Sequence, residues 1–242
     1  MEISLSLYQV EDRGDIEENV KAVVECVKKA KSDYLCVPEF FAHPLGFFRE
    51  LTEKFGNRAA EKAYERTWWV MDEVRDASKN FDGYLIAGTV IEKCQDKFYN
   101  TCYILKGGEV LAKYRKINII QEEVKAGITP GSEVLSFEGK IRTGVMVCAD
   151  CLNDEIVRKV CSRSKLVFLP ISMTSPDHPS VEGHPLSLKA ARKYGVVIAK
   201  TSRTAVYGGR KFGVKSAVIA PSGVIAEVDS IDEQILTATI NI

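Results

Sequence analysis

The sequence predicts a one-domain α/β protein in which two stacked mixed sheets carry helices on their outer faces. Three observations lead to this fold class. The 242 residues are 45% hydrophobic, which is enough to bury a large core in one α/β domain of this length. Helix and strand patterns alternate, but tight hairpins interrupt the alternation, so a wholly parallel sheet is not expected. No repeat or linker divides residues 1–242, and we therefore expect a single domain.

The N-terminal segment predicts a strand followed by an amphipathic helix. Residues 3–10 (ISLSLYQV) alternate between apolar and polar side chains, as in a half-buried strand. Asp15 and Glu18 then have the spacing of a capping box at a helix start. The residues that follow carry valines at helical spacing, at positions 20, 23, 24 and 27.

Short strands and one long helix are predicted through the middle of the chain. Residues 34–41 (YLCVPEFF) form a short strand that Pro38 ends, with Glu39 just beyond it. Residues 60–80 carry a helical pattern. Further strands are predicted around a hairpin turn at 106–109 (KGGE), over residues 84–92, 98–106 and 109–116.

The second half of the chain begins with the apolar run 141–148 (IRTGVMVC), which is typical of a buried strand. A helix through Ile156, Val157 and Val160 follows. The segment 171–185, which contains several prolines, is expected to form a lid or a pocket wall. The remaining elements are predicted as strands at 165–172 and 195–200, a helix near 182–194 and a hairpin around 221–223.

A formal net charge of zero argues against a nucleic-acid partner. The 33 basic and 33 acidic residues cancel, and Lys and Arg do not cluster. The N-terminal residues lack the basic and apolar segments of a signal peptide, and no apolar run approaches the roughly 20 residues of a membrane span. We therefore expect a soluble, cytoplasmic protein that binds neither nucleic acid nor membrane.

Seven cysteines are spread through apolar segments of the chain, and their number is odd. Without a secretion signal, reduced and mostly buried thiols are expected rather than a disulfide framework. The cysteines stand at positions 26, 36, 94, 102, 148, 151 and 161. Of these, Cys148 and Cys151 form a CxxC pair, which suits a zinc site, a redox disulfide or a catalytic thiol.

The surrounding residues favour the catalytic thiol. Structural zinc needs four ligands, but there is no second CxxC, and the histidines stand at 43, 178 and 184 without HxxxH spacing. A lone CxxC is also a weak redox signal. Cys148 lies where a buried strand gives way to a helix, and free backbone N–H groups there favour a thiolate. Bound metal or a reversible Cys148–Cys151 disulfide would support the other two interpretations.

Four stretches of the chain together resemble the carbon–nitrogen hydrolase (nitrilase) superfamily along nearly the full length. In order they are YLCVPEFF, FYNTCYILKGGEVLAKYRKINI, ITPGSE and GVMVCAD, with Glu155 after the last. The resemblance implies a four-layer α-β-β-α sandwich. It also implies a Glu-Lys-Cys active site, carried over onto Glu39, Lys116 and Cys148.

The resemblance further implies how these residues divide the chemistry. Glu39 would act as the general base and Cys148 as the nucleophile, while Lys116 and the backbone N–H of Ala149 would stabilise the developing negative charge. No metal or organic cofactor is expected.

Members of the superfamily usually carry a second glutamate shortly before a Pro-Gly pair, which is Pro130-Gly131 in this chain. Glu123 is the preferred candidate, and Glu122 is the alternative. The role implied for this glutamate is to hold Lys116 and to orient the substrate.

The implied function is that of a cofactor-free thiol hydrolase, which converts a small amide to an acid and ammonia through a Cys148 thioester. A nitrilase and a catalytically silent scaffold are the alternatives. Leu152 stands where the superfamily often has an Arg, which favours an uncharged acyl group over an N-carbamoyl amino acid. Arg203 or Arg210 could still receive the carboxylate of an ω-amide. The resemblance also implies a homodimer or a higher homo-oligomer.

Overall fold

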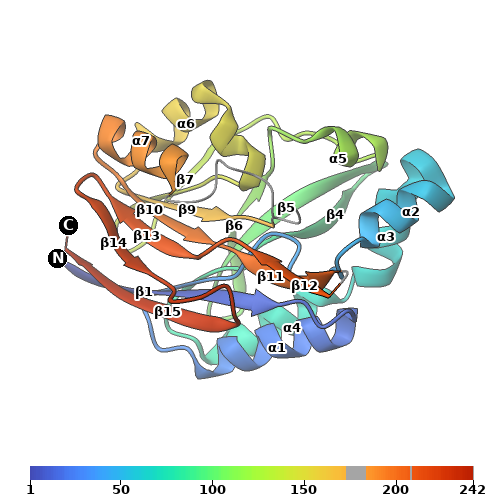
Figure 1. Cartoon of the computed structure of the whole chain (residues 1–242), viewed down its shortest axis with the longest axis horizontal. Coiled ribbons are helices and arrows are strands. Elements are labelled where there is room, and N and C mark those ends of the chain that lie inside the picture. Colours follow the sequence, from blue (N-terminus) through green and yellow to red (C-terminus); the bar gives the residue numbers. More distant parts are fainter. Residues whose placement is uncertain (173–183, 208, 242) are drawn as a thin grey trace.

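A computed structural model of the chain describes residues 1–172, 184–207 and 209–241. Two mixed β-sheets lie face to face, and helices cover their outer faces (Figure 1). This arrangement confirms the predicted four-layer α-β-β-α sandwich. Within the described residues, no helix is both long and apolar enough to span a bilayer.

The first sheet has the strand order β12 (Arg210–Gly213), β11 (Arg203–Tyr207), β1 (Glu2–Glu11), β2 (Tyr34–Cys36), β3 (Tyr84–Ile86), β5 (Lys97–Lys106) and β4 (Val90–Cys94). Two further strands belong to this sheet: β15 (Gln234–Asn241) pairs with β1, and β6 (Glu109–Arg115) pairs with β5. Strands β1, β2 and β3 are parallel to one another. Strand β15 is antiparallel to β1, and β5 is antiparallel to β3. The sheet is therefore mixed, as the interrupted alternation of helices and strands predicted.

The second sheet has the strand order β14 (Gly223–Glu227), β13 (Ala217–Ala220), β10 (Val197–Thr201), β9 (Leu166–Pro170), β8 (Arg142–Val145) and β7 (Leu135–Glu138). Strand β9 is buried on both faces. Leu166 and Phe168 pack between the two sheets, whereas Val167 and Leu169 pack toward the outer helices. Burial on both faces explains why this strand is a continuous apolar run rather than an alternating one.

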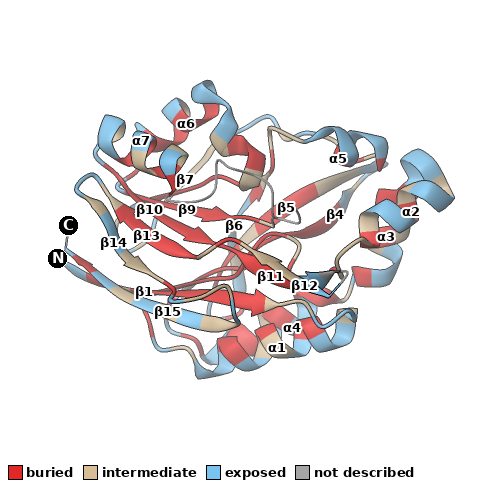
Figure 2. Cartoon of the chain, in the orientation of Figure 1, coloured by how far each residue is buried: buried red, intermediate tan, exposed pale blue. Residues whose placement is uncertain are grey.

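Helices pack on both outer faces of the sandwich. The first sheet is covered by α1 (Ile16–Lys29) and α4 (Val70–Ala77), and the second by α6 (Asp154–Cys161) and α7 (Pro185–Tyr194) (Figure 1). Helix α1 begins where predicted, because the Asp15 side chain accepts a hydrogen bond from Glu18 N at 3.1 Å. Figure 2 shows that buried residues follow the sheets and the inner faces of these helices.

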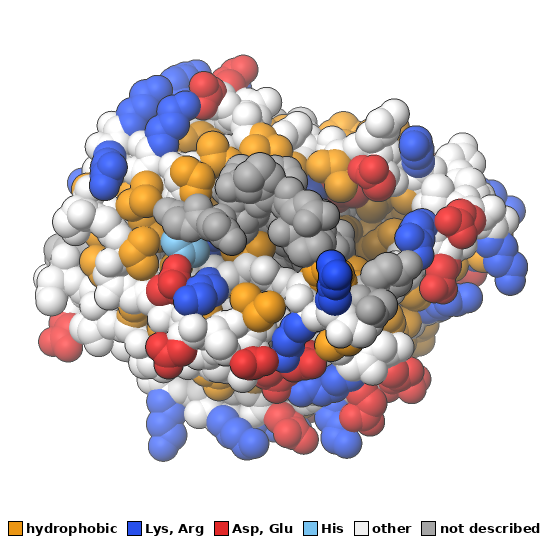
Figure 3. All heavy atoms as spheres, viewed as in Figure 1, with side chains coloured by type: hydrophobic (Ala, Val, Ile, Leu, Met, Phe, Trp, Pro, Cys, Tyr) orange, Lys and Arg blue, Asp and Glu red, His pale blue; other side chains and the backbone are white. Residues whose placement is uncertain are grey.

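The outer surface carries charges of both signs. On the face shown in Figure 3, the Lys and Arg side chains of the described residues are interspersed with Asp and Glu. This distribution agrees with the formal net charge of zero. That the protein does not bind nucleic acid stays a prediction.

The single helix predicted over residues 60–80 is wrong. The structure has α3 (Ala59–Thr67) and α4 there, separated by Trp68 and Trp69, and the 3₁₀ turn η2 (Ser78–Asn80) follows. Helix α3 packs its alanines against α2 (Phe47–Phe55), which the sequence did not reveal and which joins α3 through η1 (Gly56–Arg58). Helix α4 instead packs Val70 and Val74 against α1. The two segments pack against different hydrophobic clusters, and one straight helix could not pack against both.

The strand predicted over residues 84–92 is interrupted at Gly88, between β3 and β4. The φ angle of Gly88 is +53°, and a Cβ at this position would lie 2.0 Å from the carbonyl oxygen of Pro38. Only glycine allows so close an approach. Because Pro38 directly precedes Glu39, the backbone at Gly88 supports the loop that carries Glu39.

Gly88→Ala is expected to lower the free energy of unfolding by more than about 2 kcal/mol, because it adds a left-handed non-glycine residue and displaces the Pro38 carbonyl. Gly107→Ala is the matched control, since Gly107 has a φ of +55° but nothing within 4 Å of an added Cβ. Denaturant unfolding of both variants measures the difference. Equal losses in the two variants would show that the contact with Pro38 has no effect on stability.

Candidate active site

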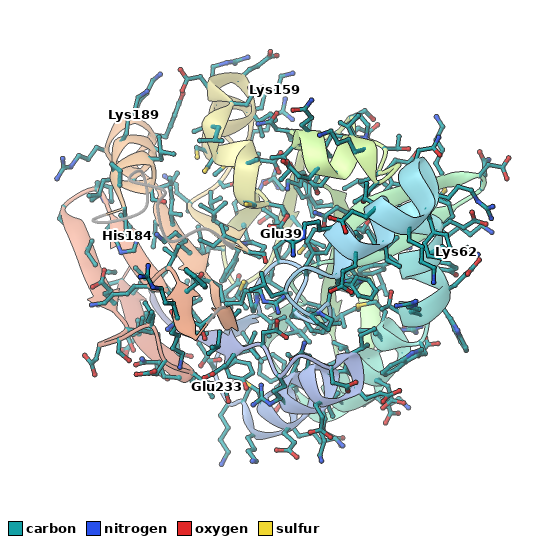
Figure 4. The ribbon with its side chains drawn as sticks, turned by 45° about the vertical axis from the view of Figure 1, so that its right-hand side comes forward. Glu39, Lys62, Lys159, His184, Lys189 and Glu233 are labelled. Carbon is teal, nitrogen blue, oxygen red and sulfur yellow. The ribbon has the colours of Figure 1, made fainter. Side chains whose placement is uncertain are left out.

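Glu39, Lys116 and Cys148 lie just beyond the ends of strands β2, β6 and β8. Strands β2 and β6 belong to the first sheet and β8 to the second, so the site joins the two sheets. Glu39 lies near the centre of the molecule in Figure 4. The structure brings the three side chains together: Lys116 Nζ is 2.9 Å from Glu39 Oε1, and both charges act on the Cys148 thiol.

Lys116 is a buried ammonium held between two carboxylates. Its side chain is 2% exposed, and Nζ lies 2.9 Å from Glu39 Oε1 and 2.7 Å from Glu123 Oε2. Burial alone would lower the pKa of Lys116, but the charges of Glu39, Cys148 and Glu123 raise it above its ordinary value. Lys116 therefore stays protonated, and supplies a fixed positive charge beside the thiol.

Glu123, rather than Glu122, lies against Lys116. Both belong to the short helix α5 (Gln121–Lys125), but Glu123 is buried and Glu122 is exposed. Glu123 Oε2 also accepts from Ile120 N at 2.9 Å, which fixes its carboxylate at the helix start. Burial raises the pKa of Glu123, and the Lys116 ammonium opposes this shift. The contact with Lys116 is thus made by Glu123, and its role as the second glutamate of the site stays a prediction.

Cys148 begins the 3₁₀ turn η3 (Cys148–Leu152) with a φ of +43°. A non-glycine residue in this left-handed region is strained by roughly 1–2 kcal/mol. Burial raises the pKa of the Cys148 thiol well above its ordinary value, Glu39 raises it further, and Lys116 lowers it. The backbone N–H of Ala149 precedes the first internal hydrogen bond of the turn, from Asp150 N to Val147 O, so the turn leaves that donor available.

The two carboxylate oxygens of Glu39 have different partners. Oε1 accepts from Lys116 Nζ, whereas Oε2 accepts from Ser172 N at 3.0 Å. The same Ser172 N–H also interacts with the Cys148 thiol and lowers its pKa, against the larger effect of burial. One backbone amide therefore lies against both Glu39 Oε2 and Cys148 Sγ, which brings the base to the nucleophile.

Asp150 links the two sheets at the site, a contact that the sequence did not reveal. It accepts from Tyr114 Oη at 2.7 Å and from Asn118 N at 2.7 Å, two residues that flank Lys116. It also accepts from Val147 N, directly before the nucleophile, at 2.8 Å. One fully buried carboxylate thus holds the lysine strand and the cysteine turn in a fixed relation.

The histidines are poorly suited to act as the base. Burial and the charge of Arg203 lower the pKa of His43 to about 3. His184 is 2.6 Å from Glu227 and lies well away from Glu39 in Figure 4. His178 lies outside the described residues. Neither of the two described histidines is therefore suited to take a proton from Cys148.

The remaining interpretations of the CxxC pair gain no support from the described residues. All seven cysteines are free thiols, so Cys148 and Cys151 are not joined. Among the described side chains, no group of three or more His, Cys, Asp or Glu could hold a metal ion. Burial raises the pKa of Cys151 to about 11, and unlike Cys148 this thiol has no Glu39 charge acting on it.

Two further expectations concern the pocket that would receive the substrate. Leu152 is 58% exposed, so it lies on the surface of the chain rather than against a buried substrate. The lid or pocket wall predicted over 171–185 falls mostly outside the described residues, apart from its ends. Of these ends, Ile171 and Ser172 follow β9, and Ser172 N is the amide that contacts Glu39.

Comparisons with known proteins show the family to which this chain belongs. The model of the carbon–nitrogen hydrolase family matches residues 4–242. Omega-amidase NIT2 of Pongo abelii is 28% identical over 192 residues, which are 72% of this chain and 66% of that protein. Glutamine-dependent NAD(+) synthetase of Thermotoga maritima is 27% identical over 250 residues, or 95% of this chain and 40% of that protein. The alignments thus span no more than about two thirds of these curated relatives.

Solved structures show the same fold. An amidase from Nesterenkonia sp. superposes with a TM-score of 0.79 at 23% identity, over 98% of this chain and 90% of that chain. A glutamate-to-glutamine variant of the Nesterenkonia sp. AN1 amidase has a TM-score of 0.81 at 21% identity, with the same coverage. That variant carries the acetamide moiety of fluoroacetamide on its active-site cysteine. From the family match, this chain belongs to the carbon–nitrogen hydrolase family.

Glu123→Gln is expected to slow amide hydrolysis at least about tenfold, the effect of losing one hydrogen bond between charged groups. Glutamine keeps the shape of Glu123 but turns an NH₂ group toward either Asn100 Nδ2 or the Lys116 ammonium, and both are donors. Glu122→Gln is the control, because Glu122 is exposed and should be replaced without effect. Steady-state rates of the folded variants measure both. Wild-type turnover in Glu123→Gln would contradict the assignment.

Proposed function

We propose that the protein is a thiol hydrolase that cleaves small amides to an acid and ammonia through a Cys148 thioester. The observation that carries the proposal is the buried Lys116, which lies 2.9 Å from Glu39 and 2.7 Å from Glu123, beside the Cys148 thiol. Burying three charged groups together is costly for stability, and such clusters are typical of functional sites. Family membership and the amidase names of several relatives support the same function.

In the first step, Glu39 takes the proton of the Cys148 thiol while sulfur attacks the amide carbon. A base is needed because burial raises the pKa of this thiol well above its ordinary value. The electron pair of the carbonyl bond moves onto oxygen. The Lys116 ammonium and the N–H of Ala149 then stabilise that negative charge in a site that needs no rearrangement.

In the second step, Glu39 returns its proton to the departing nitrogen, and ammonia leaves as the carbonyl bond re-forms. The product is a thioester between the acyl group and Cys148. Glu39, again a carboxylate, takes a proton from a water molecule that attacks the thioester. The C–S bond breaks as the acid is released, and Glu39 returns its proton to the sulfur, which restores the thiol of Cys148.

The charges around the site favour a substrate with an uncharged acyl group. Arg203 is buried and donates to the carbonyl oxygens of Phe40 and His43 at 2.6 and 2.7 Å. Its other terminal nitrogen lies 3.3 Å from Asp12. Arg203 is therefore engaged within the fold and not free to receive a substrate carboxylate, as an ω-amide would require. Residues 173–183 (MTSPDHPSVEG) also contain no Lys or Arg.

A second candidate is an ω-amide of a dicarboxylic acid. The relatives include omega-amidases and a glutamine-dependent synthetase, and their names favour such a substrate. We also propose a homodimer or a higher homo-oligomer, which the exposed apolar side chain of Leu152 at the end of η3 supports. The cytoplasmic location stays a prediction.

Ammonia release from a matched panel tests the proposed function and its substrate class. The panel holds a short aliphatic amide, the corresponding nitrile, an ω-amide and an N-carbamoyl amino acid. We expect the aliphatic amide to have the highest kcat/KM, by about tenfold or more, because an unpaired carboxylate in the site costs at least about 1.4 kcal/mol. A preference for the nitrile would indicate a nitrilase. A preference for either carboxylate-bearing substrate would contradict the argument from Arg203, and no turnover of any of them would favour a silent scaffold.

A further inference from the structure

Asn100 connects the two carboxylates of the site, although the steps above give it no role. It lies on β5 and is 1% exposed. Its Nδ2 donates to Glu39 Oε1 at 2.9 Å and to Glu123 Oε1 at 2.8 Å. An amide oxygen in this place would repel both carboxylates, so the NH₂ end must face them.

The same residue is tied to Lys116. Lys116 N donates to Asn100 O at 2.9 Å. The side chains then close a ring: Nδ2 of Asn100 and Nζ of Lys116 each donate to both Glu39 and Glu123. A single NH₂ group and a single ammonium therefore hold two carboxylates that would otherwise repel each other.

This ring makes the two oxygens of Glu39 unequal. Oε1 already accepts from both Lys116 and Asn100, at 2.9 Å each, which uses its two lone pairs. Oε2 accepts from the Ser172 N–H, which also contacts the Cys148 thiol. Oε2 is thus the oxygen that can still accept a proton, and it lies on the side of the cysteine.

We propose that Asn100 is a positioning residue that directs the catalytic proton to Oε2 of Glu39, an inference that rests on the proposed thiol hydrolase function. The Sγ–H bond of Cys148 breaks as Oε2–H forms, and the electron pair left on sulfur makes the Sγ–C bond. The same Oε2–H bond breaks when the proton passes to the departing nitrogen. Without the Asn100 amide, Oε1 has a free lone pair and competes for the proton.

The side-chain oxygen of Asn100 distinguishes the positioning role from a purely structural one. Oδ1 is buried and has no hydrogen-bond partner among the described residues. A buried acceptor without a partner costs about 1–3 kcal/mol. A residue kept for stability would have both ends paired, so Asn100 is retained for its donors. Asn100→Ala also removes the unpaired oxygen, and its loss of activity should therefore exceed its loss of stability.

The pH dependence of cysteine alkylation reports on the same ring. The Asn100 amide lowers the pKa of Glu123, which burial raises. Removing this donor disfavours the charged form of Glu123, so Glu123 holds its proton up to a higher pH. A neutral Glu123 attracts the Lys116 ammonium less strongly, which weakens the ring that presents Glu39 to Cys148. The acid limb, which is the pH range over which the alkylation rate of Cys148 falls as the pH is lowered, should then move to higher pH.

The test measures the rate at which iodoacetamide alkylates Cys148 as a function of pH, by intact mass, in wild type, Asn100→Ala and Asn100→Asp. We expect a rate at neutral pH at least about tenfold lower in Asn100→Ala, as for the loss of one charged hydrogen bond, with the acid limb at higher pH. Asn100→Asp, which adds a third carboxylate, should show the larger shift. Thr101→Ala is the matched control, because Thr101 is the next residue on β5 and donates to the Glu92 carboxylate at 2.8 Å, outside the ring.

The role of Asn100 is overturned if the acid limbs of Asn100→Ala and Asn100→Asp coincide with those of wild type and Thr101→Ala. This holds whatever the change in stability. This outcome is distinct from a failure of the proposed function. If wild-type Cys148 forms no thioester with any amide, the hydrolase mechanism fails. If the thioester forms but the limbs coincide, only the inference about Asn100 fails.

Discussion

The ammonium of Lys116 is the charge on which the rest of the site depends. A lysine side chain that is 2% exposed is stable only with close counter-charges, and Glu39 and Glu123 provide them at 2.9 and 2.7 Å. The three residues come from the loop after β2, the end of β6 and the start of α5. One buried cation thus brings together segments that share no continuous secondary structure, and without it two carboxylates would face each other in the interior.

A second constraint sets the position of the nucleophile. Apolar packing between the sheets, through side chains such as Leu7 and Phe168, holds the layers together but is not directional. Hydrogen bonds are directional, and Asp150 accepts them from Tyr114 on the first sheet and from Val147 beside Cys148 on the second. The strained backbone of Cys148 is held in this setting, so the thiol is presented to Glu39 and Lys116 at a fixed place.

The sequence predicts most of this fold because burial leaves local patterns. Strands β1 and β9 follow from alternation and from a continuous apolar run, and α1 from its valines and the cap at Asp15. The break between α3 and α4 could not be predicted, since it depends on which distant cluster each segment packs against. The burial of Glu123 rather than Glu122 also has no signal in the periodicity of the sequence, because the five residues of α5 are too few to define a buried face.

The sequence also predicts that the candidate site residues lie together, while their catalytic roles stay a prediction. Glu39, Lys116 and Cys148 stand at strand ends, which a chemical reading combined with a family resemblance can find. Asn100 lies within the stretch FYNTCYILK that carried the resemblance, but its partners are 61 and 23 residues away along the chain. Asp150 likewise bonds to residues more than thirty positions away, such as Tyr114 and Asn118. Contacts of this kind depend on the tertiary fold, and no periodicity in the sequence reports them.

The most direct test of the account is intact-mass analysis of the protein mixed with a short aliphatic amide and quenched in acid. The account predicts a mass increase that corresponds to the acyl group of the amide, mapped to Cys148. The adduct should be absent from Cys148→Ala and present in Cys151→Ala. An adduct on Cys151, or ammonia release at the wild-type rate by Cys148→Ala, would contradict the account.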